Sequence, residues 1–283
     1  MREFYLYTPD LSKYFDLNVP TALAAEPRGL GNSFSPSYKE SNSGKHLTNV
    51  TPSFEPITFL IYFNADGSDG YINYKTMLYF LEECGTSEFV LEYRDGVTRK
   101  FCDVLLKSIT KSEINEEGVF AETLTLDRQS YWYEAINEDF EFGRYESEPS
   151  FPLTFPIAFQ GANVKKEKTL TNRHFTPAPI ILRISGEITA DVSVYIKDTN
   201  GNTVSEVLIA NQLPQGSALT VDPTTKKITI TDGNGKTSNG YGLVDKTKQS
   251  FLYLPHGTYT IGSNVVSNAD GKVSLRVKKY LLD

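Results

Sequence analysis

The chain has 283 residues, with 39% hydrophobic and 22% charged side chains, a formal net charge of −7, two cysteines and three histidines. The length allows two domains with full cores, and the composition argues against a disordered chain, a membrane protein and a disulfide-stapled scaffold. Because the three histidines are far apart in the sequence, a structural zinc site and a histidine-dependent triad are not expected.

The chain begins with a predicted strand at residues 3–8 and continues into a segment with the composition of a loop. The first residues, MREFYLYTPD, contain no apolar core with a cleavage site, so no secretory leader is expected. Residues 26–56 are rich in Gly, Ser, Asn and Pro. Loops of this length in compact proteins usually have a function of their own. We therefore expect a long loop that serves as an arm.

Residues 56–63 (PITFLIYF) form the next predicted strand, because they are rich in aromatic and β-branched side chains. Residues 71–84 form the strongest predicted helix of the chain. Ile72 and Met77 contribute to an apolar face with near-helical spacing. Gly85 follows where a helix end favours a residue with positive φ. The sequence thus predicts one helix inserted among strands.

Two predicted hairpins and an acidic segment complete the N-terminal half. Residues 89–110 form the first hairpin around the favoured turn Asp95-Gly96, and the second turns at 115–118 and returns through 119–127. The acidic segment at 134–148 is interpreted either as a solvated strand or as a charged surface that faces a channel or a basic partner.

Charge and proline spacing place a domain boundary near the middle of the chain. Residues 1–150 carry 13 Lys and Arg against 25 Asp and Glu, a net of −12, whereas 151–283 carry 15 against 10, a net of +5. Three prolines in SEPSFPLTFP favour an extended linker there. We predict an N-terminal domain at 1–148, a linker at 149–157 and a C-terminal domain at 158–283. The acidic half argues against nucleic-acid binding through phosphates.

The C-terminal half contains about nine short predicted strands, separated by turn signals such as Asn200-Gly201 and Asp270-Gly271, and no helical stretch. Regular short strands of this kind predict an antiparallel β-sandwich. The predicted strands cover residues 166–172, 180–186, 192–198, 203–209, 218–221, 227–231, 251–254, 258–261 and 272–280.

Patterns that carry chemistry are weak throughout the chain. Asp198-x-Asn200-x-Asn202 begins like a calcium loop but lacks the glycine and glutamate that complete one, so a hairpin turn is predicted. Gly233-x-Gly235-Lys236 lacks the frame of a phosphate-binding loop. Neighbouring carboxylates such as Glu82-Glu83 carry no sign of burial that would mark a general acid. We expect no enzyme, and no catalytic, metal or cofactor site.

The order of these elements resembles a known family. A short N-terminal strand and a Gly/Ser-rich loop precede PITFLIYF, a helix, and hairpins around EFVLEYRDGVTRKFCDVLLKSITKSE and FAETLTLDRQSYWYE. The second half runs from FPLTFPIAF through NRHFTPAPIILRISGEI and LTVDPTTKKITI to FLYLPHGTYTI. The chain is similar to the distal tail proteins of siphophages, which are long-tailed phages with non-contractile tails, and its second half resembles the galectin-like domain of that family.

This resemblance implies a mainly β fold, with a β-sandwich-like ring domain that carries one helix and a C-terminal galectin-like sandwich. It further implies a homo-hexameric ring in the virion that joins the tail tube protein to tail-tip, baseplate and receptor-binding proteins around a channel for DNA. Assembly in the host cytoplasm would need no secretory leader. No sequence-specific nucleic acid and no membrane are expected as partners.

The candidate interface residues are aromatic or arginine side chains, which commonly anchor protein interfaces. Within the arm these are Arg28, Phe34 and Tyr38. Tyr131 and Trp132 are expected to support the interface of the ring domain.

Two other functions stay open at the level of the sequence. The first is a carbohydrate-binding module for the host cell wall in residues 158–283, where Tyr241, Tyr253 and Tyr259 are available as sugar platforms but Trp is absent. The second is a hydrolase, for which a nucleophile, a base and oxyanion donors cannot be assembled from the residues present.

Overall fold

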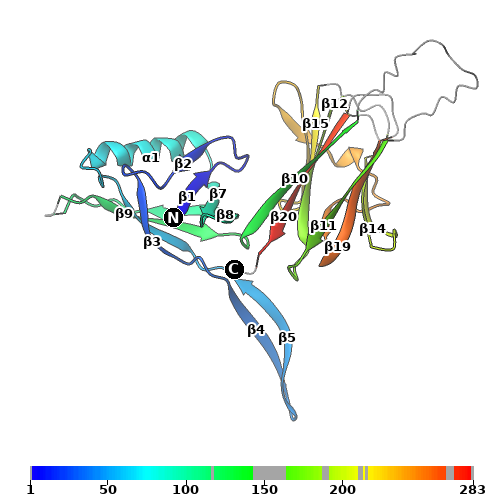
Figure 1. Cartoon of the computed structure of the whole chain (residues 1–283), viewed down its shortest axis with the longest axis horizontal. Coiled ribbons are helices and arrows are strands. Elements are labelled where there is room, and N and C mark those ends of the chain that lie inside the picture. Colours follow the sequence, from blue (N-terminus) through cyan, green and yellow to red (C-terminus); the bar gives the residue numbers. More distant parts are fainter. Residues whose placement is uncertain are drawn as a thin grey trace, which may run out of the picture. The chain divides into compact units, whose positions relative to one another are not determined.

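A computed structural model describes residues 2–115, 118–142, 164–186, 191–209, 213, 216–265 and 271–281. The chain divides into two compact units (Figure 1). Unit 1 contains Met1–Glu134 together with Leu281–Asp283, and unit 2 contains Ala135–Tyr280. The linker predicted at 149–157 lies outside the described residues, as do the last residues of the acidic segment.

Unit 1 is built on an antiparallel sheet with the strand order β2-β1-β7-β8-β9-β6-β3. The sheet folds over so that its two ends face each other, since the rings of Phe4 on β1 and Phe59 on β6 meet edge to face at 4.8 Å. The strands are β1 (Glu3–Tyr7), β2 (Tyr14–Asp16), β3 (Leu23–Arg28), β6 (Ile57–Tyr62), β7 (Glu88–Arg94), β8 (Arg99–Ile109) and β9 (Ala121–Arg128).

Alternation along the strands builds the core of unit 1. In β6 the side chains alternate between fully buried and half-buried, and β9 shows the same period of two. Such a pattern is expected where one face of a sheet covers a core and the other does not. Ile57, Phe59 and Ile61 of β6 meet Leu124 and Leu126 of β9 in this core.

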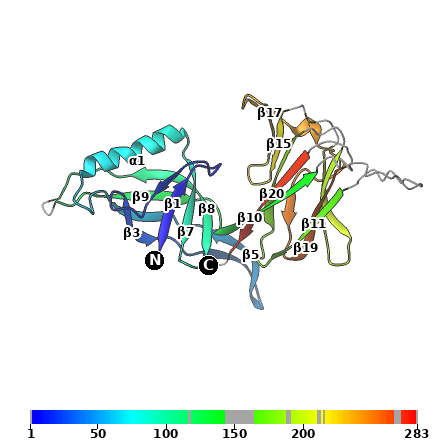
Figure 2. The same cartoon turned by 45° about the horizontal axis from the view of Figure 1, so that its top comes forward.

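Helix α1 (Gly70–Cys84) lies across the strands of unit 1 (Figure 2). It begins where Asp69 Oδ1 accepts hydrogen bonds from the backbone N–H groups of Tyr71 and Ile72, and it ends at Gly85, whose φ is 60°. Both ends therefore carry standard caps. Met77 is buried as expected, but Ile72 is 61% exposed, so its predicted place on the core face is wrong.

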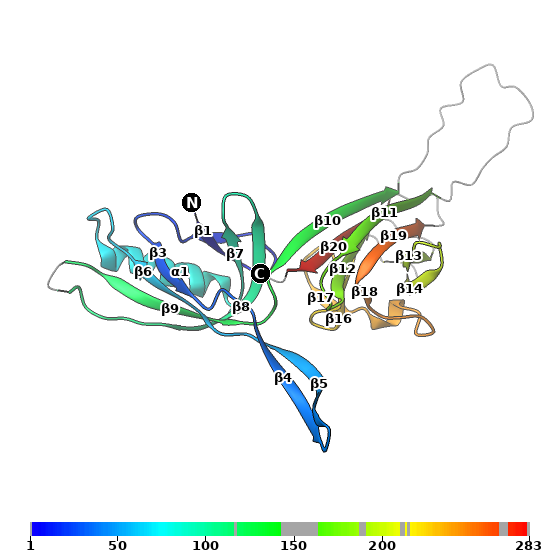
Figure 3. The same cartoon turned by 60° about the horizontal axis from the view of Figure 1, so that its bottom comes forward.

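Residues 33–53, for which the sequence predicts a loop, form a two-stranded antiparallel ribbon of β4 (Ser33–Ser41) and β5 (Gly44–Ser53). The ribbon forms a sheet of its own and projects from the rest of unit 1 (Figure 3). Its prolines, Pro36 and Pro52, fit because both strands are edges, where a missing N–H breaks no ladder to a third strand. Residues 33–53 therefore form regular strands although their composition is typical of a loop.

Unit 2 is a sandwich of two antiparallel sheets. One has the order β17-β16-β15-β12-β20-β10, with β18 also paired to β12, and the other has the order β11-β19-β13-β14. The strands are β10 (Tyr133–Phe142), whose first two residues belong to unit 1, β11 (Val164–Asn172), β12 (Ala178–Gly186), β13 (Val192–Lys197), β14 (Thr203–Ile209), β15 (Ala218–Asp222), β16 (Lys227–Thr231), β17 (Thr237–Asn239), β18 (Leu252–Leu254), β19 (Gly257–Val265) and β20 (Gly271–Tyr280).

Branched aliphatic side chains from both sheets fill the core of unit 2. Ile180, Leu182 and Ile184 of β12 face this core together with Val194 and Ile196 of β13. Each of the nine predicted strands corresponds to an observed one. The sequence analysis did not predict β17 or the following 3₁₀ turn η1 (Tyr241–Leu243).

The mainly β fold, with antiparallel sheets and one α-helix among the described residues, confirms the predicted fold class. No helix in the described part of the chain is long and apolar enough to cross a membrane.

Candidate interaction surface: the ribbon and its anchor

The β4–β5 ribbon is amphipathic. Its register pairs Phe34 with Pro52 and Tyr38 with Leu47, and Pro36 lies between them on the same strand face. Directly opposed residues of an antiparallel pair point to the same side, and side chains alternate along each strand except where the register shifts between Ser37 and Tyr38. These five side chains therefore share one face, which we call the apolar face of the ribbon.

The opposite face is polar. It carries side chains of the intervening residues, which include Ser35 paired with Thr51, Ser37 paired with Asn49, and Lys39 paired with His46. The apolar face ends near the tip of the ribbon, where Glu40 and its partner Lys45, on the same side as Tyr38, form an ion pair of 3.4 Å. The two faces differ in chemistry as the buried and wet faces of a sheet normally do.

In the described part of the chain, the side chains of the apolar face are exposed to solvent. All described side chains from 34 to 53 are exposed, with Phe34 at 41%, Tyr38 at 54% and Leu47 at 59%. An isolated two-stranded ribbon is marginally stable in water, and exposed apolar patches mark interaction sites. The ribbon therefore has the features of a strand pair that packs its apolar face against the surface of another molecule.

The base of the ribbon is fixed to the core of unit 1. The indole Nε1 of Trp132 donates a hydrogen bond of 2.7 Å to the carbonyl oxygen of Leu30. The ring of Tyr131 meets the ring of Phe54 edge to face at 5.1 Å. Because Tyr131 and Trp132 are 5% and 2% exposed, respectively, both contacts come from rigid core side chains.

Arg128 makes the second attachment. Arg128 as a whole is 3% exposed. Its guanidinium donates hydrogen bonds to Ser130 O at 2.9 Å, Gly31 O at 2.7 Å and Asn32 Oδ1 at 2.6 Å. It also lies over the Phe54 ring at 5.2 Å. A planar fork with five donors suits such a set of fixed acceptors.

Gly29 lets the chain leave β3 close to another strand. It has a φ of +75°, and a Cβ at this position would lie 2.1 Å from the carbonyl oxygen of Pro56. Only glycine combines that backbone conformation with that approach. Gly29, Arg128, Tyr131 and Trp132 together form what we call the anchor of the ribbon.

The candidate residues from the sequence fall into three places. Phe34 and Tyr38 lie on the apolar face, as an interface role requires. Arg28 lies at the end of β3, with a side chain that is 78% exposed and 3.7 Å from Glu26. Tyr131 and Trp132 are buried, so any support they give to an interface acts through the anchor.

Sequence reasoning missed Leu47, Gly29 and Arg128. Leu47 could have been found by pairing the two halves of residues 33–53 as a hairpin, because alternation then places it opposite Tyr38. Nothing local marks Arg128 or Gly29, since their partners lie 97 residues away at Gly31 and across the sheet at Pro56.

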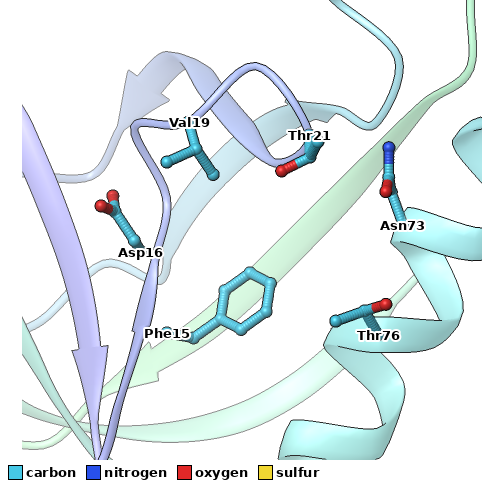
Figure 4. A pocket seen from close by; sticks show the side chains of 6 residues that line it. All are labelled: Phe15, Asp16, Val19, Thr21, Asn73 and Thr76. Atoms are coloured by element: carbon cyan, nitrogen blue, oxygen red, sulfur yellow. The ribbon is translucent and has the colours of Figure 1, made fainter. Parts of the chain in front are cut away.

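A shallow pocket of about 180 Å³ lies between the segment after β2 and helix α1 (Figure 4). Its polar groups already serve the local structure. Asp16 Oδ1 accepts from the backbone and the side chain of Asn18 at 2.8 and 2.7 Å, and Asn73 Nδ2 donates to Phe63 O at 2.6 Å. Thr76 donates to the backbone of its own helix. The pocket therefore offers no catalytic arrangement.

Two carboxylates in the described part of the chain are buried, namely Glu122 on β9, which is 1% exposed, and Glu92 on β7, which is fully covered. Arg94 donates to Glu92 at 2.6 and 3.2 Å, and Arg99 donates to it as well. Burial raises the pKa of Glu92, but hydrogen bonds from Arg94, Arg99 and Tyr7 outweigh burial and hold the pKa below its usual value. A carboxyl that stays ionised in this way stabilises the sheet and is poorly suited to donate a proton.

Among the described residues, no three His, Cys, Asp or Glu side chains lie close enough to hold a metal ion. Cys102 is buried, and burial raises the pKa of its thiol to about 11, so at neutral pH it is protonated. A protonated, buried thiol is chemically inert.

Comparison with known proteins shows which family the chain resembles. Residues 3–129 match the family model of the distal tail protein N-terminal domain. The chain carries a distal tail protein domain. The resemblance to distal tail proteins drawn from the sequence is thereby confirmed. No curated protein matches the sequence.

Solved structures extend the similarity in fold to the whole chain. A chain of the phage P2 baseplate in its activated conformation with Ca has a TM-score of 0.68 at 16% identity, and the match covers 100% of this chain and 99% of that one. The same baseplate with Sr gives 0.64 at 17% identity, covering 97% and 98%. The distal tail protein of phage SPP1, described as a hub of the adsorption apparatus in phages that infect Gram-positive hosts, gives 0.54 at 12% identity, covering 98% and 99%. The chain thus has the fold of distal tail and baseplate hub proteins.

Proposed function

We propose that this distal tail protein forms a homo-hexameric ring in the tail of a siphophage virion and joins the tail tube to the tail tip. The role is structural, with no catalytic step and no cofactor. The observation that carries the proposal is the apolar face of the ribbon, which is exposed along its whole described length and held by a rigid anchor.

A second copy of the chain is the occupant that fits this face in a ring. A contact in which a projecting element meets a different surface of the next subunit is heterologous, and such contacts close into rings when the rotation allows it. Each subunit then both extends its own ribbon and receives one, so the apolar side chains of all ribbons are covered. The anchor fixes the direction in which each ribbon leaves its unit.

The charge distribution suits a channel that DNA passes through. Residues 1–134, which form most of unit 1, carry 12 Lys and Arg against 20 Asp and Glu, a net charge of −8, and like charge keeps a polyanion from adhering to a wall. Unit 1 is therefore the part we assign to the ring and its central opening. Unit 2 is then free to meet receptor-binding or baseplate proteins, while the tail tube protein and the tail-tip proteins lie on the two sides of the ring.

The related structures support these partners, since the P2 chains belong to a baseplate and the SPP1 protein to an adsorption hub. Assembly inside the host cytoplasm, before release of the virion, belongs to the same proposal. Neither a membrane nor a specific nucleic-acid sequence has a role in it.

The experiment compares the purified full-length chain with a variant in which residues 33–53 are replaced by a short Gly/Ser linker. Light scattering gives the mass in solution, and negative-stain images of the same samples show its form. We expect rings of about six subunits with an open centre for the natural chain, in the point-group symmetry usual for homo-oligomers, and monomers for the variant. Rings of unchanged mass from the variant would remove the ribbon from the proposal.

A further inference from the structure

A second pocket lies in unit 2, far from the ribbon in the sequence, and the proposed ring does not use it. It measures about 330 Å³ and is open to solvent. Strand β16, the edge strand β17 and the turn η1 form its walls. It is lined by Lys227, Ile228, Thr229, Thr237, Ser238, Asn239 and Tyr241.

The aromatic ring in this pocket is held in a fixed orientation. The hydroxyl of Tyr241 donates to the carbonyl oxygen of Lys226 at 2.6 Å, and the ring meets Phe251 nearly at right angles, with centroids 6.4 Å apart. The backbone N–H of Tyr241 donates to Asn239 Oδ1 at 3.0 Å. The residue nevertheless stays 38% exposed. It is a preorganised ring with part of its surface in water.

Most of the polar side chains around this ring are left unused by the fold, although Asn239 Oδ1 already accepts from Tyr241. Thr229 is paired directly with Asn239, and Thr231 with Thr237, so hydroxyl and amide groups stand together on one side of the β16–β17 hairpin. Within the described part of the chain, the side chains of Lys227, Thr229 and Thr237 make no hydrogen bond and no ion pair. Their donors and acceptors are available to a ligand.

The chemistry of this lining selects a class of ligand. Sugars combine a face of C–H groups, which packs on an aromatic ring, with hydroxyls that both donate and accept hydrogen bonds. The lining supplies one ring, several hydroxyls, an amide and one ammonium group, and it contains no carboxylate, so it does not suit a metal cation. An open groove at a sheet edge also suits the middle of a polymer better than a small enclosed molecule.

We propose that this pocket binds a neutral oligosaccharide segment, with Tyr241 as the platform and Thr229, Thr237 and Asn239 as hydrogen-bonding groups. The site lies on unit 2 alone, so it does not depend on the ring. It would give the tail tip a direct contact with a surface polysaccharide in addition to any contact made by receptor-binding proteins.

The test uses the full-length chain and four neutral tetrasaccharides, built from glucose, galactose, rhamnose and N-acetylglucosamine, respectively. Saturation-transfer NMR detects binding, and calorimetric titration measures it. We expect at least one probe to bind with a Kd of about 1 mM. Because the probes carry no charge, raising NaCl from about 50 to about 500 mM should leave the Kd unchanged.

Variants test whether the probes bind at the ring of Tyr241 or at another exposed aromatic ring. Tyr241→Ala should weaken binding by about tenfold or more, which corresponds to about 1.4 kcal/mol, whereas Tyr241→Phe keeps the ring and should retain binding. Thr229→Val removes one hydroxyl at nearly constant shape and should weaken binding without affecting the fold. Phe175→Ala is the control, because Phe175 is 56% exposed in the same unit but does not line this pocket.

Three results would overturn the assignment. They are the absence of binding to all four probes, an unchanged Kd in both Tyr241→Ala and Thr229→Val, and a Kd that depends strongly on salt, which stacking and hydrogen bonding to an uncharged sugar would not produce. Circular dichroism of each variant confirms the fold, and Thr229→Val decides the question if Tyr241→Ala fails to fold.

Discussion

The indole Nε1 of Trp132 donates a hydrogen bond of 2.7 Å to the carbonyl oxygen of Leu30, although the two residues are 102 positions apart in the chain. This bond joins the end of unit 1 to the segment that leads into the ribbon. The backbone of Leu281 also donates to Trp132 O at 2.8 Å. Trp132 thus fastens both the base of the ribbon and the return of the chain from unit 2 into unit 1.

Replacing Trp132 by Phe should loosen the ribbon and destabilise unit 1. The change leaves the carbonyl of Leu30 without its donor and leaves a small cavity, at a combined cost of about 2 kcal/mol in the free energy of unfolding. Urea denaturation measures this cost, and hydrogen exchange should show faster exchange at residues 33–53. Tyr74→Phe is the matched control, because it removes a buried hydroxyl donor to Thr110 O in the same core, far from the ribbon. Equal exchange of the ribbon in both variants would argue against the anchor.

Replacing Arg128 by Lys should have a similar effect, although the charge is kept. A lysine cannot reach Gly31 O, Asn32 Oδ1 and Ser130 O together, so we expect a loss of about 2 kcal/mol in the free energy of unfolding. Limited proteolysis should then cut near residues 31–33. Arg28→Lys, at an exposed arginine, should leave both the unfolding free energy and the proteolysis unchanged. If Arg128→Lys behaves like this control, the three hydrogen bonds do not hold the ribbon.

The two glycines at the base of the ribbon should respond differently to alanine. Gly29→Ala places a Cβ 2.1 Å from Pro56 O at a φ of +75°, and we expect a loss of more than about 2 kcal/mol because the backbone must move. Gly31→Ala meets nothing within 4 Å and should cost little. Thermal unfolding of both variants gives the comparison, and similar melting temperatures would contradict it.

Glu92 should make the free energy of unfolding of unit 1 depend on pH in the acidic range. Its folded pKa is lowered, so its contribution is present above the unfolded pKa of about 4.3 and is lost as the pH falls through the folded pKa. Glu92→Gln should therefore cost about 2 kcal/mol at pH 7, and this cost should shrink as the pH falls below the unfolded pKa and vanish once the folded carboxyl is protonated. Urea unfolding at several pH values measures the difference. A difference that does not vary with pH would show that the ion pairs contribute nothing.

Local signals predicted a large part of this fold. The helix was predicted at 71–84 and found at Gly70–Cys84, because Asp69 and Gly85 cap it from within the same stretch of chain. The strands of unit 2 followed from alternation and from turn residues such as Asn200-Gly201. Features of this kind depend on neighbours in the sequence, so composition and spacing are enough to locate them.

The ribbon and its anchor depend on contacts that no local pattern contains. Residues 33–53 pair only with each other, so their polar and proline-containing sequence carries no core-facing alternation that a strand in a larger sheet would show. The anchor depends on Arg128 and Trp132, about 100 residues from the backbone that they bind. The sequence predicts Tyr131 and Trp132 as supports of the ring-domain interface, and their burial is not predictable from their aromatic character alone.

The most direct test of the central claim changes only the apolar face of the ribbon. The variant Phe34→Ser/Tyr38→Ser/Leu47→Ser removes that face, and Ser35→Ala/Ser37→Ala/Thr51→Ala changes the polar face as the control. Light scattering of both variants and the natural chain, at equal concentration, gives their masses. We expect rings from the natural chain and the control, and monomers from the apolar-face variant. Rings of the same mass from all three, or a natural chain that stays monomeric at every concentration, would contradict this expectation.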